Sequence, residues 1–273
     1  MTLSFSVCMS VYKNDNPTDF KEAVLSIYNQ TYPPDEIILV IDGPVPDMML
    51  KTIENLSEKT GIMKVIPLSK NQGHAIARQT GLEAARNELC AVMDADDLSV
   101  PDRFEKQLKA FEEHPEVSVV GGLINEFIHD TDNVVGTRIV PEKDSDIKEY
   151  LKSRCPMNLV TVMLKKSDVM KVGGYQDWYC EEDYYLWIRL ALGGYKFYNI
   201  QDNLVNVRVG EEMYQRRGGK KYFESEARLQ KYMFDNKLIL WPKYAYNVTI
   251  RWAVQVAMPN WLRGWMFRTF ARN

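Results

Sequence analysis

The sequence predicts an α/β fold in which helices flank a mostly parallel central sheet. Strand and helix patterns alternate along the first half of the 273-residue chain, as they do in β-α-β units that build parallel sheets. The run Glu36 to Ile41 reads Glu-Ile-Ile-Leu-Val-Ile. A nearly continuous apolar run of this length is typical of a strand that is buried on both faces.

Local signals mark the individual elements of the first half. Thr18 is the predicted N-cap of the first helix, Gly61 fits the end of the second, and Pro101 is expected in the first turn of the fourth, where proline is tolerated. The predicted order is strand Leu3 to Val11, helix Asp19 to Gln30, strand Glu36 to Ile41, helix Met48 to Lys59, strand Met63 to Leu68, helix Ala75 to Ala85, strand Leu89 to Met93 and a helix from Pro101.

The second half has a different pattern. Glycine turns, short strands and aromatic residues are expected from Gly121 to about Arg208, followed by a helix from about Lys220 to Asn236. No linker-like stretch separates these regions. A split into two independent domains is therefore not supported, and we assign residues 1–218 to the main domain and 219–273 to its helical C-terminal extension.

Composition narrows the class of protein. A hydrophobic fraction of 45% fits a folded core, and the formal net charge of -3 argues against a nucleic-acid binder, which would usually be basic. The four cysteines form no C-x-x-C pair, so reduced thiols are expected rather than disulfides or a zinc site. No cationic signal-peptide start and no uninterrupted apolar span are visible, and these features predict a cytoplasmic protein.

Polar residues follow each predicted strand of the first half. In parallel sheets, ligands bind beyond the carboxyl ends of the strands. The residues at these positions are Ser10 and Tyr12, Asp42 and Gly43, Asn71 to Gly73, and Asp94 to Asp97. Because all four groups fall at one edge of the sheet, we expect a single binding site there.

The cluster Asp94-Ala95-Asp96-Asp97 indicates a metal site. Neighbouring carboxylates raise one another's pKa unless something neutralises them, and Mg²⁺ or Mn²⁺ prefers oxygen ligands. So few protein ligands leave room for oxygens of a substrate diphosphate. The alternative is that Asp96 or Asp97 merely caps a turn before Pro101.

A series of motifs lies in fixed order along the chain. They are Ser6 to Tyr12, Gln30-Thr31-Tyr32-Pro33, Asp42-Gly43, Asn71-Gln72-Gly73 with Ala77-Arg78 and Gly81, Asp94 to Asp97 with Pro101 and Arg103, Gly173-Gly174-Tyr175, and Glu182-Asp183 with Leu186 to Leu190. Together these motifs resemble those of the family 2 glycosyltransferases, which implies a GT-A fold with a Rossmann-like sheet over roughly residues 4 to 210. A narrower resemblance, through Arg216-Arg217-Gly218-Gly219, is to bacterial amylovoran-type enzymes that build exopolysaccharide or other surface glycans.

The resemblance implies a donor site for a nucleotide diphosphate sugar, with UDP as the expected nucleotide. Ser10 and Tyr12 would lie beside the nucleoside, and Asp42 would accept a hydrogen bond from the uracil ring N–H. Asn71 and Arg78 would contact the base or the phosphates. As alternatives, Tyr12 could be a core aromatic, Asp42 a plain turn residue and Arg78 a partner in a surface ion pair.

The same resemblance implies the catalytic groups. Asp94 would lie near the ribose and the metal, Asp96 would ligate Mn²⁺ or Mg²⁺, and Asp183 would be the general base of an inverting displacement. Glu182 and Arg208 are assigned to substrate binding. The alternative for Glu182-Asp183 is a helix N-terminus, where carboxylates favour the dipole; Trp187 and Leu190 behind them are expected in the core.

Three departures from the family pattern are visible. Arg208 is followed by Val209-Gly210 and not by the usual histidine, and His74, His114 and His129 lie elsewhere, so the third metal ligand is left open. The second strand ends in Ile41-Asp42 instead of paired aspartates. The processive signature Q-x-x-R-W is absent, which favours one sugar per acceptor.

The end of the chain is basic and aromatic, with no Asp or Glu after Asp235. Such a segment predicts a peripheral membrane surface element at the inner face of the cell membrane, serving a lipid-linked glycan acceptor; packing on the core or in an oligomer is the alternative. It contains Lys237, Lys243, Arg251, Arg263, Arg268 and Arg272 among Trp241, Tyr244, Tyr246, Trp252, Trp261, Trp265, Phe267 and Phe270.

Other functions fit less well. A nucleotidyltransferase or sugar-nucleotide synthase would share the metal and the nucleotide, but Ser10 to Asn16 offers no glycine-rich basic loop. A dehydrogenase is disfavoured because no G-x-G-x-x-G follows the first strand. A catalytically silent binding module would not need Asp94, Asp96 and Asp183 together.

Overall fold

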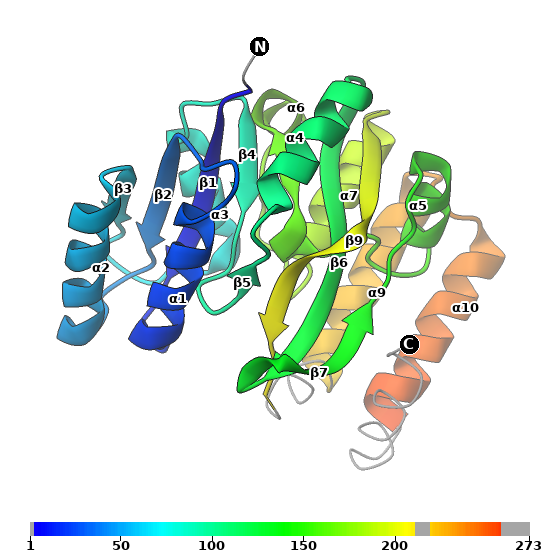
Figure 1. Ribbon diagram of the computed structural model, residues 1–273. Helices are drawn as coiled ribbons and strands as arrows, with labels where there is room; N and C mark the ends of the chain where they lie inside the picture. Colours follow the sequence, from blue (N-terminus) through cyan, green and yellow to red (C-terminus); the bar gives the residue numbers. More distant parts are fainter. Residues whose placement is uncertain (1–2, 211–218, 258–273) are drawn as a thin grey trace.

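The computed structural model describes residues 3–210 and 219–257 and contains one large mixed sheet between layers of helices (Figure 1). The strand order is β3-β2-β1-β4-β8-β6-β9-β5, and β7 pairs with the carboxyl-terminal residues Ile124 to Ile128 of β6. Strands β3, β2, β1 and β4 are parallel to one another, whereas β8 runs antiparallel to both β4 and β6. The predicted fold class is confirmed.

The first half follows the predicted alternation closely. Each buried strand is an apolar run, and each helix that follows carries an apolar stripe onto the sheet. The elements are β1 Phe5–Val11, α1 Pro17–Tyr28, β2 Glu36–Ile41, α2 Asp47–Thr60, β3 Met63–Pro67, α3 His74–Ala84, β4 Leu89–Val92, β5 Leu98–Ser99 and α4 Arg103–Glu113.

Two predicted helix starts are wrong. Asn16, and not Thr18, caps α1: its side chain accepts a hydrogen bond from the Thr18 amide at 2.8 Å, and Pro17 takes the first helical position. Helix α4 begins at Arg103 with Asp102 as its N-cap, so Pro101 lies in the turn before the helix.

The second half contains longer strands than predicted. Strands β6 (Val117–Ile128) and β9 (Lys196–Arg208) run parallel to each other over most of their length. The remaining elements are β7 Asp130–Arg138, α5 Asp144–Leu151, η1 Leu159–Thr161, β8 Met163–Lys165, α6 Lys166–Lys171, α7 Glu182–Leu192, α9 Lys220–Asp235, α10 Trp241–Trp252 and η2 Ala253–Ala257.

Glycines inside β6 allow this close packing. A Cβ on Gly121 would lie 2.5 Å from the Asn199 side chain, and one on Gly122 would lie 2.4 Å from the side chain of Leu204. Both neighbours belong to β9. The glycines predicted as turns therefore bring the two long strands together.

Two apolar cores cover the two faces of the sheet. One joins β1 and β2 to helices α1, α2 and α4, through residues such as Phe20, Ile53 and Phe104. The other lies under α3, α5, α7 and α9, and contains Trp187 and Leu190, as predicted. Leu229 of α9 also belongs to this second core, so the C-terminal helices are packed onto the main domain. The division at residue 218 adjoins the undescribed segment 211–218 and stays a prediction.

Candidate active site

The carboxyl ends of β1, β2 and β4 bring the predicted polar residues to one edge of the sheet. The register pairs Ser10 with Val40, and the Asp42 amide donates to the Val11 carbonyl at 2.8 Å. Ser10 and Tyr12 are partly exposed there. The Tyr12 ring lies edge-on to His74 at the start of α3, with 6.5 Å between the ring centroids.

Asp42 organises the loop before α3. Its buried carboxylate accepts hydrogen bonds from the Asn71 side chain (3.0 Å) and from the amides of Gln72 (2.7 Å) and Gly73 (2.9 Å). Gly43 has φ +85°, and a Cβ there would lie 2.4 Å from the Asn71 amide nitrogen. Asp42 therefore acts structurally as well as standing at the predicted nucleoside site.

Arg78 of α3 joins the two predicted acidic groups. Its guanidinium pairs with Asp94 at 3.2 Å and with Glu182 at 2.5 Å, and only 11% of its side chain is exposed. Glu182 begins α7, 104 residues further along the chain from Arg78. The predicted donor cluster and the predicted carboxylate pair therefore meet at one buried cation, and the surface ion pair considered for Arg78 is in fact an interior one.

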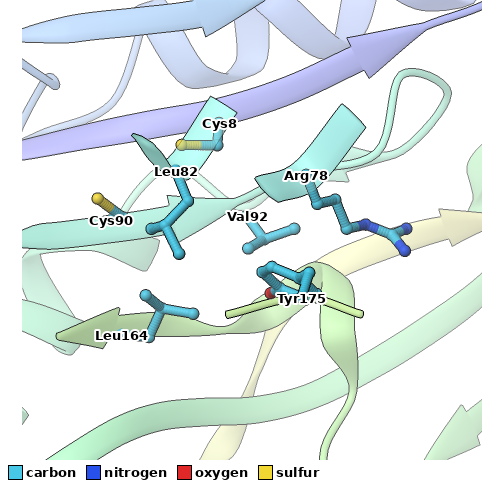
Figure 2. Close-up of a pocket in the computed structure, with 7 residues that line it drawn as sticks. All are labelled: Cys8, Arg78, Leu82, Cys90, Val92, Leu164 and Tyr175. Carbon is cyan, nitrogen blue, oxygen red and sulfur yellow. The ribbon is translucent and has the colours of Figure 1, made fainter. Parts of the chain in front are cut away.

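A small cavity lies under Arg78 (Figure 2). Its volume is about 10 Å³, and its walls are mainly apolar, from β1, α3, β4, β8 and the loop that carries Tyr175. The stem of Arg78 lines it, while the guanidinium points away toward the carboxyl end of the sheet. This void is far too small for a nucleotide and belongs to the packing that holds Arg78.

The acidic cluster contains residues in different environments. Asp96 is exposed to solvent, whereas Asp97 is buried and accepts a hydrogen bond from the Arg208 amide at 2.9 Å. Desolvation, and then the charge of Asp94, raise the pKa of Asp96 to about 6. Asp97 thus anchors the turn, which agrees with the capping alternative for this residue, while Asp96 stays accessible.

Arg208 serves this turn through several contacts. Its guanidinium donates to the Asp96 carbonyl at 3.2 Å and to Glu22 at 2.9 Å, and it lies 3.5 Å from Asp19. The same group lies over the Phe127 ring, 4.9 Å from its centroid. In this structure Arg208 ties the end of β9 to α1, and its assignment to substrate binding stays a prediction.

Asp183 lies in the first turn of α7, in a protected position. Its carboxylate accepts a hydrogen bond from the Tyr184 amide at 2.7 Å and contacts the Cys155 thiol at 3.8 Å. Desolvation, and then the neighbouring Glu182, raise the pKa of Asp183, while Arg78 and Arg138 act to lower it. A partly desolvated carboxylate of raised pKa is suited to proton abstraction.

Two residues near the site had no role in the sequence prediction. Asp15 accepts a hydrogen bond from the Tyr12 amide at 2.9 Å, and desolvation is the main cause that raises its pKa to about 6, with Asp96 and Asp94 adding to it. Arg103 is fully buried and donates to the Val92 carbonyl at 2.8 Å, at the end of β4. An Asp three residues after a strand-end Tyr could have marked Asp15, whereas Arg103 was named only as part of a motif, and no local signal indicates that it is buried.

The carboxylates at the strand ends could hold a divalent cation only together with ligands from the substrate. Among the described residues, no group of three or more His, Cys, Asp or Glu side chains is arranged as a closed metal site. Asp94 and Asp96 nevertheless offer carboxylate oxygens whose mutual repulsion a cation would relieve. These residues fit an open Mn²⁺ or Mg²⁺ site that is completed by phosphate oxygens.

Comparison with known proteins identifies the family. A model described as Glycosyl transferase family 2 matches residues 6–174. An uncharacterized glycosyltransferase of Haemophilus influenzae is 41% identical and covers 84% of this chain and 85% of its own length. The amylovoran biosynthesis glycosyltransferase AmsE of Erwinia amylovora is 36% identical over 82% of this chain and 84% of its own length.

A third relative is similar over its whole length. It is the UDP-Gal:alpha-D-GlcNAc-diphosphoundecaprenol beta-1,3-galactosyltransferase of Escherichia coli, 33% identical over 100% of this chain and 98% of its own length. Together the relatives confirm the resemblance that the motifs carried, and they show that the chain is a transferase enzyme.

Solved structures share the fold. Staphylococcus aureus TarS 1–349 in complex with UDP has a TM-score of 0.65 at 17% identity, over 97% of this chain and 79% of that one; the chain spans 44% of the longer TarS structure. The mannosyltransferase PcManGT of Pyrobaculum calidifontis, in complex with GDP-Man and Mn²⁺, has a TM-score of 0.59 at 18% identity, over 98% of this chain and 79% of that one.

Proposed function

Because the chain belongs to glycosyl transferase family 2, we propose that it moves a hexose from a UDP-sugar to a hydroxyl group of a lipid-linked glycan in bacterial polysaccharide biosynthesis, with inversion at the anomeric carbon. One observation carries this proposal. Arg78 contacts both Asp94 and Glu182, so a donor held at the strand ends lies next to the carboxylates of α7.

We assign the donor to the edge formed by β1, β2 and β4. Ser10 and Tyr12 flank the nucleoside, and Asn71 and Arg78 contact the base or phosphates. Asp42 already accepts three hydrogen bonds, but a carboxylate has about four acceptor positions and can take one more from a uracil N–H. The UDP complex of the structural neighbour TarS and the UDP-Gal donor in the name of the E. coli relative support this choice.

We assign Asp94 and Asp96 as the residues that hold Mn²⁺ or Mg²⁺, which neutralises charge on the leaving diphosphate when it is bound. Arg78 contributes a fixed positive charge beside Asp94. The hydrogen bond from the Arg208 amide to Asp97 fixes the turn, and Asp96 stays accessible on it. We assign no third protein ligand to the metal.

The transfer step assigned to Asp183 is one direct displacement. The acceptor hydroxyl loses its proton to Asp183 as its oxygen bonds to the anomeric carbon, and the bond from that carbon to the β-phosphate oxygen breaks, releasing UDP. Burial keeps Asp183 basic enough to take the proton. Glu182 stays paired with Arg78 and orients the start of α7.

The test is a panel of UDP-hexoses, with UDP-galactose first, assayed for UDP release with Mn²⁺ and a polyprenyl-diphosphate-linked N-acetylglucosamine acceptor. Asp183→Asn should lower kcat by about 10²–10⁴, the usual value of general-base help, and leave donor affinity unchanged. Asp96→Ala should abolish metal-dependent donor binding in calorimetry.

The matched control is Asp177→Asn, which changes an exposed Asp in the loop before α7 to which we assign no role. Normal turnover in Asp183→Asn would refute the base assignment. Pyrophosphate release from UTP and a hexose 1-phosphate, with no UDP release from any UDP-hexose, would instead support the nucleotidyltransferase alternative.

A further inference from the structure

Helix α10 has an outward face that is almost entirely apolar. The exposed apolar residues are Trp241 (62% exposed), Tyr246 (63%), Ile250 (46%) and Trp252 (50%) of α10, Leu240 (75%) just before it and Val256 (41%) of η2 after it; we call these six residues the α10 face. Among the described residues, no helix is long and apolar enough to cross a bilayer. A surface helix of this kind is therefore suited to lie along an interface rather than to span one.

The sequence segment that contains α10 carries charges of one sign. From Asn236 to the end of the sequence there are six Lys or Arg residues and no Asp or Glu. Lys237 and Lys243 flank the face, and the basic and aromatic pattern continues through Trp261 and Arg263, which lie outside the described residues. A second copy of this segment would be repelled by like charge, whereas anionic headgroups would be attracted.

The opposite side of α10 holds the loop beside the proposed base. Asn247 donates to the Lys152 carbonyl at 2.8 Å, and Arg251 donates to the Ser153 carbonyl at 2.7 Å. Cys155, at the end of the same loop, contacts Asp183 at 3.8 Å.

Helix α9 completes this connection. Arg251 pairs with Glu226 of α9 at 3.1 Å, with little of either side chain exposed. The hydroxyl group of Tyr222, also on α9, donates to Glu181 at 2.7 Å, next to the carboxylate pair. Figure 1 shows α10 running beside α9 toward the end of the molecule at which β1 and β2 end.

From this geometry we propose that the α10 face docks on the surface of an anionic phospholipid bilayer, and that the docked helix holds the acceptor side of the site at the headgroup level. The benefit for catalysis rests on the proposed function, because it requires an acceptor anchored in lipid. Trp and Tyr side chains favour this depth, where one end of the ring is apolar and the other wet.

The test compares three full-length proteins in co-sedimentation with vesicles of phosphatidylglycerol and phosphatidylcholine. The docking variant is Trp241→Ser/Tyr246→Ser/Trp252→Ser. The matched control is Met48→Ser/Leu50→Ser, which removes exposed apolar side chains (70% and 40% exposed) from α2. Thermal midpoints establish that all three proteins are folded.

We expect the docking variant to bind vesicles at least about tenfold more weakly, because it lacks three large side chains that the bilayer would bury. The control should bind like wild type, and pure phosphatidylcholine should bind wild type weakly. The docking variant should still transfer sugar to a water-soluble acceptor analogue at the wild-type rate, and lose transfer only to the acceptor in vesicles.

The outcomes separate the two proposals. Unchanged vesicle binding by the docking variant overturns the docking proposal, even where transfer is normal. A wild-type dimer in solution that the docking variant dissociates also overturns it, because the face would then contact a second copy. Strong, α10-dependent vesicle binding by a wild type that transfers no sugar supports docking and removes only the proposed function.

Discussion

At the residue scale, the site is defined by how each carboxylate is compensated. Asp42 is satisfied by loop amides, Asp97 by the Arg208 amide, and Glu182 by Arg78. Among the described residues, neither Asp96 nor Asp183 forms an ion pair as close as that of Glu182 with Arg78, and the pKa of both is raised. Asp96 and Asp183, to which we assign metal binding and proton abstraction, are thus among the carboxylates that the surrounding protein leaves without a close cation.

This arrangement predicts a stability that depends on pH in the opposite sense to a salt-bridged carboxylate. Burial raises the pKa of Asp15 and Asp96 in the folded state to about 6, above their pKa in the unfolded chain. At a pH between the folded and unfolded pKa values, the folded state therefore binds more protons than the unfolded state. The contribution to stability is present at low pH and is lost as pH rises through about 6. Metal-free protein should therefore melt several degrees higher near pH 5 than near pH 7.5, in scanning calorimetry.

The control for this effect is Asp96→Asn, which removes one of the titrating groups. The variant should show a smaller change in melting temperature over the same pH interval and should be the more stable protein at pH 7.5. A melting temperature that falls steadily from pH 7.5 to pH 5 in the wild type would contradict the prediction.

The sequence predicted which residues gather at the sheet edge but not how they pair. Strand ends could be located because apolar runs stop at Val11, Ile41 and Met93, and parallel strands meet at one edge. The contact of Arg78 with Glu182 spans 104 residues, and no local pattern encodes such a pairing. Likewise, the binding of Arg208 to α1 depends on β9 reaching the far side of the cluster.

At the element scale, β4 and α4 fix the acidic turn between them. The guanidinium of the fully buried Arg103 donates to the Val92 carbonyl (2.8 Å), the Ser99 hydroxyl (3.0 Å) and the Gln107 side chain (3.1 Å). Burial lowers the pKa of Arg103 to about 9, with Asp97 opposing the shift, so the group stays charged at neutral pH. It supplies a positive charge beneath a cluster that would otherwise be repulsive.

Replacing Arg103 by Met should therefore destabilise the fold and the turn together. The loss of a buried, hydrogen-bonded network typically costs about 2–4 kcal/mol, and this value should appear in urea unfolding. Mn²⁺-dependent donor binding should weaken as well, because the turn loses its support.

The matched control for that change is Arg86→Met, since the Arg86 side chain is 65% exposed and also donates to a backbone carbonyl. It should change stability by less than about 1 kcal/mol. Equal losses in the two variants would show that Arg103 has no special role at the turn.

Element lengths were harder to predict where glycine had a packing role. Gly121 and Gly122 resembled a turn, yet they lie inside β6 because side chains of β9 occupy the space where a Cβ would be. By contrast, Gly61 has φ +66° and ends α2 as predicted. The same residue type thus marks a helix end in one place and a close strand contact in another, and only the tertiary structure distinguishes them.

At the scale of the whole molecule, the C-terminal helices join the proposed membrane surface to the proposed base. Asn247 is the central contact: it is buried, and its side-chain amide donates to the Lys152 carbonyl and to Gln230 of α9, each at 2.8 Å. It therefore positions the loop that carries Cys155 against Asp183 without touching the substrate.

Asn247→Ala should lower kcat several-fold with a water-soluble acceptor and leave donor affinity unchanged, because the loop loses its support while the strand-end residues do not. The pH profile of kcat should also shift, since the surroundings of Asp183 set its pKa. Asn236→Ala is the control, because Asn236 makes a similar bond to a backbone carbonyl (2.9 Å) at an exposed position. If Asn247→Ala lost stability alone, with kcat and its pH profile as in wild type, α10 would be a structural helix and the link between membrane docking and the base would be wrong.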